Sequence, residues 1–317
     1  MKLADSRIVI TGGTGFLGRY LHQALLALGN TRVHALGHEH YDLTDPDDAR
    51  ALFADLKPDL VFHLAAKVGG IGANRAAPAT FLHANTLMGL HLLDAARDTG
   101  VSKIVMVGTT CAYPKFAVPP FKETCLWDGY PEETNAPYGV AKRLLLVAAE
   151  AYRQQYGLDV ITLIPTNLFG ASDNFDLQTS HVIPALIRKI DAALLGGATE
   201  VQLWGDGTPT RDFLYVSDCV QGLLAAARDY HGAAPINLGS GEEVSIAEVA
   251  AVIARIMGFP GTFAWDPTQP NGQPRRQLDV TCAHELLGWS AATPLEHGLQ
   301  QTIDWWRNEG REIWGLP

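Results

Sequence analysis

The chain has 317 residues, a formal net charge of −10 and 47% hydrophobic residues. This length predicts two domains, or one domain with a large appendage, and the composition is that of an ordinary globular enzyme. The negative charge argues against a nucleic-acid partner, which requires a basic face, and no apolar run reaches the roughly 20 residues that span a bilayer.

The first predicted elements are a strand, a glycine-rich turn and a helix. A short strand is expected at 7–10, where an arginine is followed by three apolar residues. It precedes Gly12, Gly15 and Gly18, and a helical pattern follows over residues 19–28. Glycines at this spacing permit a tight turn, backbone approach to a pyrophosphate and close packing of the helix on the sheet. A turn that binds nothing is the alternative, but the strand–turn–helix context favours a dinucleotide site.

Strands and helices then alternate through the first half of the chain. We expect strands at 31–36, 59–66, 103–107 and 159–164, and helices at 46–56 (with Asp45 as its N-cap), 78–99 and 138–156. Alternation at this spacing predicts an α/β fold, a doubly wound parallel Rossmann sheet with right-handed crossovers. The strands are almost continuously apolar, as expected for a parallel sheet that is buried on both faces.

The alternation becomes less regular after residue 170. Helices are expected at 181–195, 217–229, near 245–257 and near 295–309, and strands at 201–204 and 235–238. We therefore predict that residues 1–168 and 212–241 form a cofactor-binding Rossmann domain. Residues 169–211 and 242–317 are expected to form a smaller C-terminal α/β lobe that binds the substrate.

A tyrosine and a lysine lie four residues apart at the start of the helix expected at 138–156. Tyr138 and Lys142 therefore share one helix face. A phenol beside an ammonium can donate a proton, and we expect the positive charge to lower the pKa of Tyr138 below its usual value of about 10. The hydroxyl of Thr109, at the end of the preceding strand, could contact the same substrate oxygen. The pattern predicts proton transfer to an oxygen of the substrate.

Further segments narrow the class of protein. The TxxGxxG turn followed by YxxxK resembles the short-chain dehydrogenases/reductases, and the length and second lobe resemble the extended branch that acts on nucleotide sugars. Residues 66–71, 110–114, 165–168, 173–175, 180–186, 204–209 and 274–280 together resemble the GDP-L-fucose synthase family. Members of this family epimerise C3 and C5 of GDP-4-keto-6-deoxymannose and use NADPH to reduce its C4. The resemblance spans nearly the whole chain, to about Val280.

This resemblance implies roles for five catalytic residues. Tyr138 would protonate the C4 oxygen during hydride transfer, Lys142 would hold the nicotinamide ribose, and Thr109 replaces the family's usual serine. Cys111 and His181 match the family's epimerisation pair, although a small buried cysteine and a surface histidine are the structural alternatives. Independently, the C4 ketone acidifies the protons on C3 and C5, and inversion needs a base on one face and an acid on the other. A thiol and an imidazole suit that task at neutral pH, and Tyr138 and Thr109 could stabilise the enolate oxygen.

The resemblance also implies NADPH as the cofactor, with contacts from many positions. These are Gly12, Thr14, Gly15, Phe16, Leu17, Gly18, His38, Asp42, Leu43, Ala65, Lys67, Asn85, Tyr138, Lys142, Pro165, Asn167, Leu168 and His181. The residues alone leave NAD and NADP open, because no acid follows the second strand until Glu39 and Thr14 replaces the family's phosphate-binding arginine. His38 could meet a phosphate, and NADP is expected from the resemblance.

Substrate binding needs local positive charge, because a GDP-sugar carries a diphosphate and the chain is acidic. The resemblance and the charge argument together give Thr109, Asn167, Val182, Arg188, Lys189, Trp204, Arg211 and Arg276 as substrate-binding residues. Lys189 stands where the family often has arginine, which replaces a bidentate fork by a point charge. Trp204 is expected to pack on the nucleotide. His38 and His40 lack a third ligand nearby, so no metal is assigned.

The sequence leaves three alternatives to fucose synthesis. One is the same chemistry on a related GDP-4-keto sugar, such as a dideoxyhexose or a heptose. A second is a nucleotide-sugar 4-epimerase or 4,6-dehydratase, although dehydratases of this branch carry an acidic pair where this chain has Cys111-Ala112. The third is a non-catalytic, cofactor-sensing protein.

Assembly and location are also predicted. The resemblance implies a homodimer formed by the helices near 80–98 and 138–156, the second of which has an apolar run at Leu144–Val147. The chain begins with a short segment that passes directly into a strand, so we expect no signal peptide. The four cysteines are scattered, which fits the reducing cytoplasm, and we expect no nucleic-acid or membrane partner.

Overall fold

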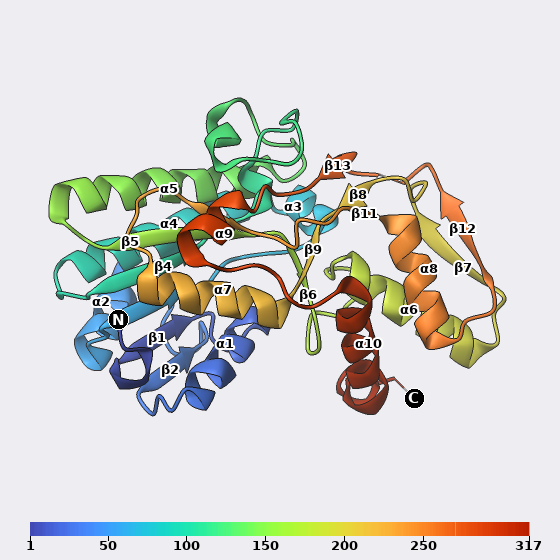
Figure 1. The fold of residues 1–317 in the computed structure, drawn as a ribbon, viewed down its shortest axis with the longest axis horizontal. Helices are drawn as coiled ribbons and strands as arrows, with labels where there is room; N and C mark the ends of the chain where they lie inside the picture. The colour runs from blue at the N-terminus through green and yellow to red at the C-terminus, as the bar shows by residue number, and fades with distance from the viewer. Residues whose placement is uncertain (270, 317) are drawn as a thin grey trace.

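A six-stranded parallel sheet forms the centre of the larger lobe (Figure 1). The computed structural model describes residues 1–269 and 271–316. The sheet has the order β10-β5-β4-β3-β1-β2, with β1 (Ile8–Thr11), β2 (Val33–Leu36), β3 (Leu60–His63), β4 (Lys103–Val107), β5 (Val160–Pro165) and β10 (Ile236–Leu238). All adjacent strands run parallel, so the predicted doubly wound fold is confirmed.

Helices cover both faces of this sheet. α1 (Phe16–Ala27) and α7 (Val216–Asp229) pack on one face, while α2 (Pro46–Leu56), α4 (Pro78–Arg97) and α5 (Ala136–Tyr156) pack on the other. Successive strand residues serve opposite faces, as the two-residue period of a strand requires: Ile8 and Ile10 face α1 and α7, and Val9 faces α2 and α4. Asp45 caps α2 by accepting a hydrogen bond from the Asp47 N–H, as predicted.

The second lobe lies at one end of the sheet, on the right of Figure 1. Its helices are α6 (Val182–Gly196), α8 (Ile246–Met257) and α10 (Leu295–Trp305), and its strands β7 (Glu200–Trp204) and β12 (Thr262–Asp266) pair in parallel. These elements share a core that contains Phe175, Ile187, Ile253 and the fully buried Trp306. α10 continues into a π-helical turn at Trp306–Gly310 and a short α11 (Arg311–Ile313).

Very short strands join the two lobes. β6 (Asn167–Phe169) pairs with β9 (Phe213–Tyr215), and β8 (Thr210–Arg211) lies between β11 (Val244–Ser245) and β13 (Arg275–Arg276). These two- and three-residue strands were not expected, because nothing local in the sequence specifies such short pairings. They bring Arg211 and Arg276 to the same register position of neighbouring strands.

The C-terminal segment is shared between the lobes, in contrast to the expected assignment of residues 242–317 to the substrate lobe. α9 (Thr281–Leu287) packs against α7 and β10, and Ala283 and Trp289 belong to the core of the Rossmann sheet. Leu278 packs with Tyr113 and Phe121 beneath the loop after β4. The chain therefore returns from the second lobe to pack against the Rossmann sheet at α9.

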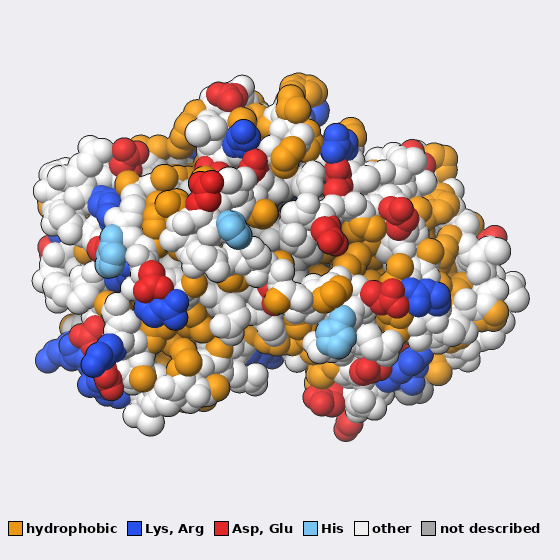
Figure 2. Space-filling model, in the orientation of Figure 1, with side chains coloured by type: hydrophobic (Ala, Val, Ile, Leu, Met, Phe, Trp, Pro, Cys, Tyr) orange, Lys and Arg blue, Asp and Glu red, His pale blue; other side chains and the backbone are white. Residues whose placement is uncertain are grey.

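The loop between β4 and α5 projects from the top of the view in Figure 1. It contains the 3₁₀ turns η2 (Thr110–Ala112) and η3 (Glu123–Trp127), and a helix α3 (Ile71–Ala76) lies after β3. Figure 2 shows hydrophobic side chains gathered on this projection, where Phe116, Val118 and Tyr130 are exposed. A cavity of about 450 Å³ lies beside the loop, lined among others by Lys115, Glu132 and Arg275.

Within the described residues, no helix has the combination of length and apolarity that a membrane span requires.

Candidate active site

The glycine-rich turn leaves the start of α1 open to a ligand. Gly12 has a φ of +70°, and a Cβ there would lie 2.8 Å from the Ala65 nitrogen, so only glycine fits. A Cβ on Gly18 would lie 2.3 Å from the Gly12 carbonyl oxygen, which explains the close packing of helix on turn. α1 has no side-chain cap from the part of the chain that is described, so its first N–H groups are free to bind phosphate. The turn fits a dinucleotide pyrophosphate.

The side chains of this turn have different surroundings. Thr14 and Gly15 are exposed, and Leu17 packs partly into the core. Phe16 is half-buried and packs edge-on against Tyr20, with ring centroids 5.9 Å apart. Contact with a phosphate would therefore come from the backbone and from Thr14, rather than from Leu17.

The residues predicted for the adenosine end of the cofactor lie after β2. His38 is 97% exposed at its side chain, and its Nδ1 is 3.5 Å from a carboxylate oxygen of Glu39. Hydrogen bonds from Thr44 lower the pKa of Asp42. Leu43, in contrast, is 4% exposed and packs in the core between α2 and α4, so only its backbone is within reach of a ligand.

Asn85 is a clamp on the loop after β3. It is 2% exposed; its Oδ1 accepts a hydrogen bond from the Lys67 N–H at 3.0 Å, and its Nδ2 donates to the carbonyls of Lys67 and Phe81. Both ends of the amide are thus used by the backbone. Asn85 shapes the loop that carries Ala65 and Lys67, which is a different role from the direct cofactor contact expected from the sequence.

The end of β4 and the start of α5 meet at the predicted catalytic residues. A Cβ on Gly139 would lie 2.2 Å from the Cys111 carbonyl oxygen, so glycine here allows α5 to approach η2 closely. Thr109 Oγ1 accepts a hydrogen bond from the Cys111 N–H at 3.2 Å. Lys142 Nζ, one helical turn after Tyr138, donates to the Val107 carbonyl at 3.0 Å. The structure therefore brings Thr109, Cys111, Tyr138 and Lys142 together.

Burial is the main cause of the pKa shifts of Lys142 and Tyr138. It lowers the pKa of Lys142 to about 8. Burial also raises the pKa of Tyr138, and the charge of Cys111 adds to this, while a hydrogen bond with Thr109 opposes it. The expectation that Lys142 lowers the pKa of Tyr138 is wrong for this structure, because the largest cause of the shift is the loss of water around the buried phenol, which raises the pKa. Tyr138 stays protonated at neutral pH and can act as a proton donor.

Two arginines from the short strands lie near Cys111. Arg276 Nη1 lies 3.8 Å from the Cys111 Sγ. Burial, followed by the charge of Arg276, lowers the pKa of Arg211 to about 10, while the charges of Glu243 and Cys111 act in the opposite direction.

His181 approaches from the other lobe as the N-cap residue of α6. A Cβ on Gly70 would lie 3.5 Å from the Ser180 carbonyl oxygen, so α6 begins beside the loop after β3. His181 is exposed, yet the surrounding atoms desolvate its imidazole and lower its pKa, which favours the neutral base. Asn167 Nδ2 donates to the Asp212 carbonyl at 2.8 Å. Pro165 and Leu168 flank the same strand junction, buried and half-buried respectively.

The remaining residues predicted to bind the substrate lie in different parts of the second lobe. Lys189 Nζ lies 5.9 Å from the centroid of the Trp204 ring and donates to the Gln202 carbonyl at 3.1 Å, and 66% of Trp204 is exposed. Val182 is half-buried in the first turn of α6. Arg188 Nη1 donates to the Phe175 carbonyl at 2.7 Å, so this arginine braces the loop before α6.

Three residues that sequence reasoning did not single out support this site. Gly139 permits the close approach of α5, Gln273 binds the guanidinium of Arg276, and Asp212 accepts hydrogen bonds from Ser240. Burial raises the pKa of Asp212 to about 6. A carboxylate directly before the apolar run 213–216 was the available signal for Asp212, whereas Gln273 carried none.

An open glycine turn, a buried Tyr–Lys pair and a thiol beside two arginines define a Rossmann-fold enzyme that moves protons and hydride at a nucleotide-bound substrate. The profile of the NAD dependent epimerase/dehydratase family matches residues 8–239, and the chain belongs to this family.

Curated relatives cover almost the whole chain. GDP-L-fucose synthase 1 of Arabidopsis thaliana is 39% identical over 306 residues, covering 96% of this chain and 94% of that protein. GDP-L-fucose synthase of Escherichia coli (strain K12) is 36% identical, with 96% and 97% covered. GDP-L-colitose synthase of Yersinia pseudotuberculosis is 34% identical, with 96% and 98% covered. The resemblance to GDP-L-fucose synthases and the prediction of an enzyme are confirmed.

Solved structures give the same result. A GDP-L-fucose synthetase from Naegleria fowleri superimposes with a TM-score of 0.90 at 30% identity, over 97% of this chain and 95% of that one, and it has also been solved bound to NADP. A GDP-6-OMe-4-keto-L-xylo-heptose reductase from C. jejuni superimposes with a TM-score of 0.90 at 26% identity, over 98% and 99%.

Proposed function

We propose that the protein converts GDP-4-keto-6-deoxy-D-mannose into GDP-L-fucose, by epimerisation at C3 and C5 and NADPH-dependent reduction at C4. The observation that carries this proposal is the placement of Cys111 within the same site as Thr109, Tyr138 and Lys142. A plain reductase needs the last three, whereas epimerisation also needs a group that exchanges protons with carbon.

In the reduction half, NADPH supplies a hydride to C4 when it is bound. Tyr138 donates its proton to the C4 oxygen, and its raised pKa keeps that proton available at neutral pH. The ammonium of Lys142, fixed by the Val107 carbonyl, stabilises the resulting phenolate and holds the cofactor ribose. Thr109 donates a second hydrogen bond to the same oxygen.

In the epimerisation half, the Tyr138 and Thr109 hydroxyls stabilise the enolate that forms when C3 or C5 loses its proton. Cys111 and His181 come from different lobes, on β4–η2 and at the start of α6, and would work on opposite faces of the sugar. One of them takes the proton from carbon and the other returns a proton from the other side, so the proton count is unchanged. The lowered pKa of His181 suits the accepting role.

The cofactor is NADP(H), which fits the open α1 turn, and the exposed His38 would meet the additional phosphate. The diphosphate of the sugar nucleotide would be held by Arg211 and Arg276, and the nucleoside by Lys189 and Trp204. The residues thus offer positive charge at two places along an extended ligand.

The test is NADPH oxidation with GDP-4-keto-6-deoxymannose, run in parallel with NADH and with Cys111→Ser. We expect rapid NADPH consumption that yields GDP-L-fucose, and an unepimerised product from the cysteine variant. Failure to turn over this sugar despite tight NADPH binding would overturn the proposed substrate.

A second candidate is the same chemistry on another GDP-4-keto sugar. It is favoured by the similarity to a GDP-L-colitose synthase and to a heptose reductase, at nearly complete coverage of each chain. A product analysis with 4-keto dideoxyhexose and heptose substrates distinguishes the two candidates, since the preferred sugar has the highest kcat/KM.

The protein is also proposed to form a homodimer through α4 and α5. Helix α5 splits its apolar run: Leu145 is buried against Gly89 of α4, whereas Leu144 and Val147 are exposed, as is Leu82 of α4. An exposed apolar stripe on two adjacent helices is typical of a subunit interface.

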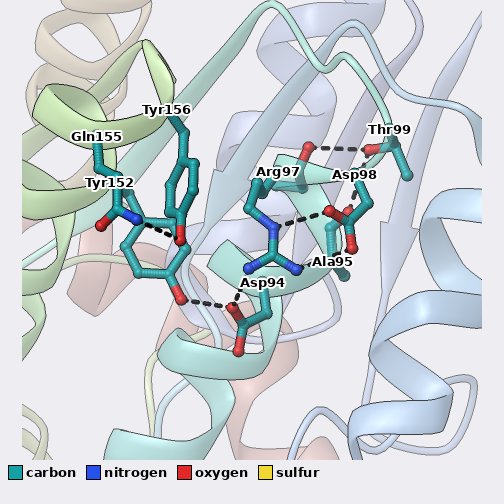
Figure 3. Close-up of polar contacts among 9 residues, drawn as sticks. Asp94, Ala95, Arg97, Asp98, Thr99, Tyr152, Gln155 and Tyr156 are labelled. Atoms are coloured by element: carbon teal, nitrogen blue, oxygen red, sulfur yellow. Dashed lines mark hydrogen bonds and ion pairs between the residues drawn. The ribbon is translucent and has the colours of Figure 1, made fainter.

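Polar contacts hold α4 and α5 together at their C-terminal ends (Figure 3). Tyr152 of α5 donates a hydrogen bond to Asp94 of α4, and Arg97 pairs with Asp98 while lying 5.3 Å from the Tyr156 ring centroid. The two helices would thus present one rigid face. We expect a dimer mass by light scattering that Val147→Asp converts to a monomer, while Leu195→Asp, at an exposed leucine of α6, leaves the mass unchanged. A monomer mass for the unmodified protein would contradict this assembly.

A further inference from the structure

Arg276 is held in place by a buried glutamine. Gln273 is 8% exposed, and its Oε1 accepts hydrogen bonds from Arg276 Nε at 3.2 Å and from Nη2 at 3.1 Å. The remaining terminal nitrogen, Nη1, is the one that lies 3.8 Å from Cys111 Sγ. The two-point grip on one edge of the planar guanidinium therefore fixes the direction of its other edge.

The same glutamine also holds the segment that follows Cys111. Its Nε2 donates to the Lys115 carbonyl at 2.9 Å. One end of the amide thus binds the chain four residues after the thiol, and the other end binds the arginine that faces it. Gln273 connects the two partners of the Cys111–Arg276 contact although it touches neither the sulfur nor a reacting atom.

We propose that Gln273 is a positioning residue that keeps the Arg276 guanidinium against the sulfur of Cys111 and so maintains the reactivity of this thiol. The role in catalysis rests on the proposed epimerase function. An arginine on a two-residue strand has several free torsions, and ordering them costs free energy that the grip of Gln273 offsets. A fixed cation beside sulfur stabilises the thiolate, the form that reacts with electrophiles and accepts a proton from carbon.

Other charged or titratable groups limit the size of the effect. The charges of Cys111 and Arg211 on β8 also interact, and Tyr138 on α5 interacts with Cys111 as well. Releasing Arg276 should therefore weaken the reactivity of the thiol without abolishing it.

The first experiment measures alkylation of Cys111 by iodoacetamide at fixed pH in the full-length protein, followed on the Cys111 peptide by mass spectrometry. We expect Gln273→Met to slow alkylation roughly fivefold, within the range of couplings between contacting residues. Gln277→Met is the matched control, because this nearby amide binds the Gly241 carbonyl instead of Arg276, and it should leave the rate unchanged.

A double-variant comparison separates positioning from a general structural effect. In an Arg276→Met background, Gln273→Met should cause no further loss, because its influence passes through Arg276. An additional loss in that background, or equal rates for Gln273→Met and Gln277→Met, would overturn the proposal. If Gln273→Met does not fold, Arg276→Lys tests the same point: it keeps the charge but loses the fork, and alkylation as fast as in the unmodified protein would also overturn it.

The second experiment follows turnover in D2O. Gln273→Met should reduce deuterium incorporation at C3 and C5 severalfold more than it reduces NADPH oxidation, so that unepimerised product accumulates. Equal loss of both activities would argue against a specific role in epimerisation. If the unmodified enzyme does not accept the GDP-4-keto sugar at all, the proposed function fails, while the alkylation rates still decide the role of Gln273.

Discussion

Two buried lysines lie at opposite ends of strand β4 and have opposite surroundings. Lys103, at the first residue of the strand, is 1% exposed and lies 3.4 Å from the Asp159 carboxylate, with the Tyr230 carbonyl also accepting a hydrogen bond. Lys142 is 5% exposed and donates to a carbonyl at the other end of the strand. Burial lowers the pKa of both, but Asp159 opposes this only at Lys103.

The difference distinguishes Lys103, whose charge stabilises the fold, from Lys142, whose charge takes part in the chemistry. A buried cation with a carboxylate partner is stabilised as an ion and contributes to the integrity of the fold. A buried cation held by a neutral carbonyl is kept near its titration point, which is typical of functional sites. The carboxyl end of the sheet carries the chemistry of this enzyme, and the amino end carries a charge network formed by Lys103, Asp159, Arg153 and His231.

The largest expected effect is on activity at the carboxyl end. Lys142→Met should slow 4-keto reduction by about 10²–10⁴-fold, because the phenolate of Tyr138 loses its cation. Lys103→Met is the matched control, since it removes a lysine that is equally buried, and it should leave kcat within about twofold. Initial rates of NADPH oxidation measure both, and similar losses in the two variants would show that the comparison is mistaken.

The second effect is on stability at the amino end. Asp159→Asn leaves Lys103 buried without its carboxylate, and we expect the free energy of unfolding to fall by about 3 kcal/mol, with kcat retained. Urea denaturation at pH 7 measures this change. Asp98→Asn is the control, because its pair with Arg97 is on the surface and should contribute less than about 1 kcal/mol. Adding Lys103→Met to Asp159→Asn should recover part of the loss, and no recovery would count against the ion-pair explanation.

The sequence predicted the carboxyl end better than the lobe that faces it. Spacing alone places Tyr138 and Lys142 on one helix face, and the glycine turn specifies its own strand–turn–helix context. The direction of the Tyr138 pKa shift could not be predicted, because it depends on the walls of the site, which come from distant segments. The run Leu144–Val147 was offered as apolar material for a dimer interface, but a helix turns 100° per residue and divides the run between core and exterior.

The substrate side was less predictable for a related reason. Arg211 and Arg276 are 65 positions apart and meet through paired strands of two residues each, which no local pattern specifies. Gln273 and Asp212 hold this arrangement through single side chains, and their roles are visible only once the partners are known. Long helices and strands with a periodic pattern of hydrophobic residues were predicted correctly. Contacts between short segments that are distant in the sequence were not.

The third prediction concerns the pH dependence of reduction. Lys142 is charged below its pKa of about 8 and loses its proton as the pH rises through that value. Because the pKa of Tyr138 is raised, the phenol stays protonated over the same range. We therefore expect kcat/KM to be constant to about pH 8 and to fall about tenfold per pH unit well above it. Lys142→Arg should move the decline beyond the measured range, and a decline that stays at the same pH in this variant would assign it to another group.

The smallest effect is the pH dependence of stability contributed by Lys142. Its folded pKa of about 8 lies below the unfolded value of 10.5, so between these two pH values the unfolded chain binds more protons and stability rises with pH. Replacement by methionine removes this dependence. The variant should exceed the unmodified protein in free energy of unfolding at pH 7, and the excess should shrink by about 1 kcal/mol by pH 9, since one pKa unit corresponds to about 1.4 kcal/mol. Urea denaturation at pH 7, 8 and 9 measures this change, with Lys103→Met as the reference for loss of a paired lysine. An excess that stays constant with pH would mean that Lys142 gains a compensating charge partner in solution, and the distinction between the two ends of β4 would then be lost.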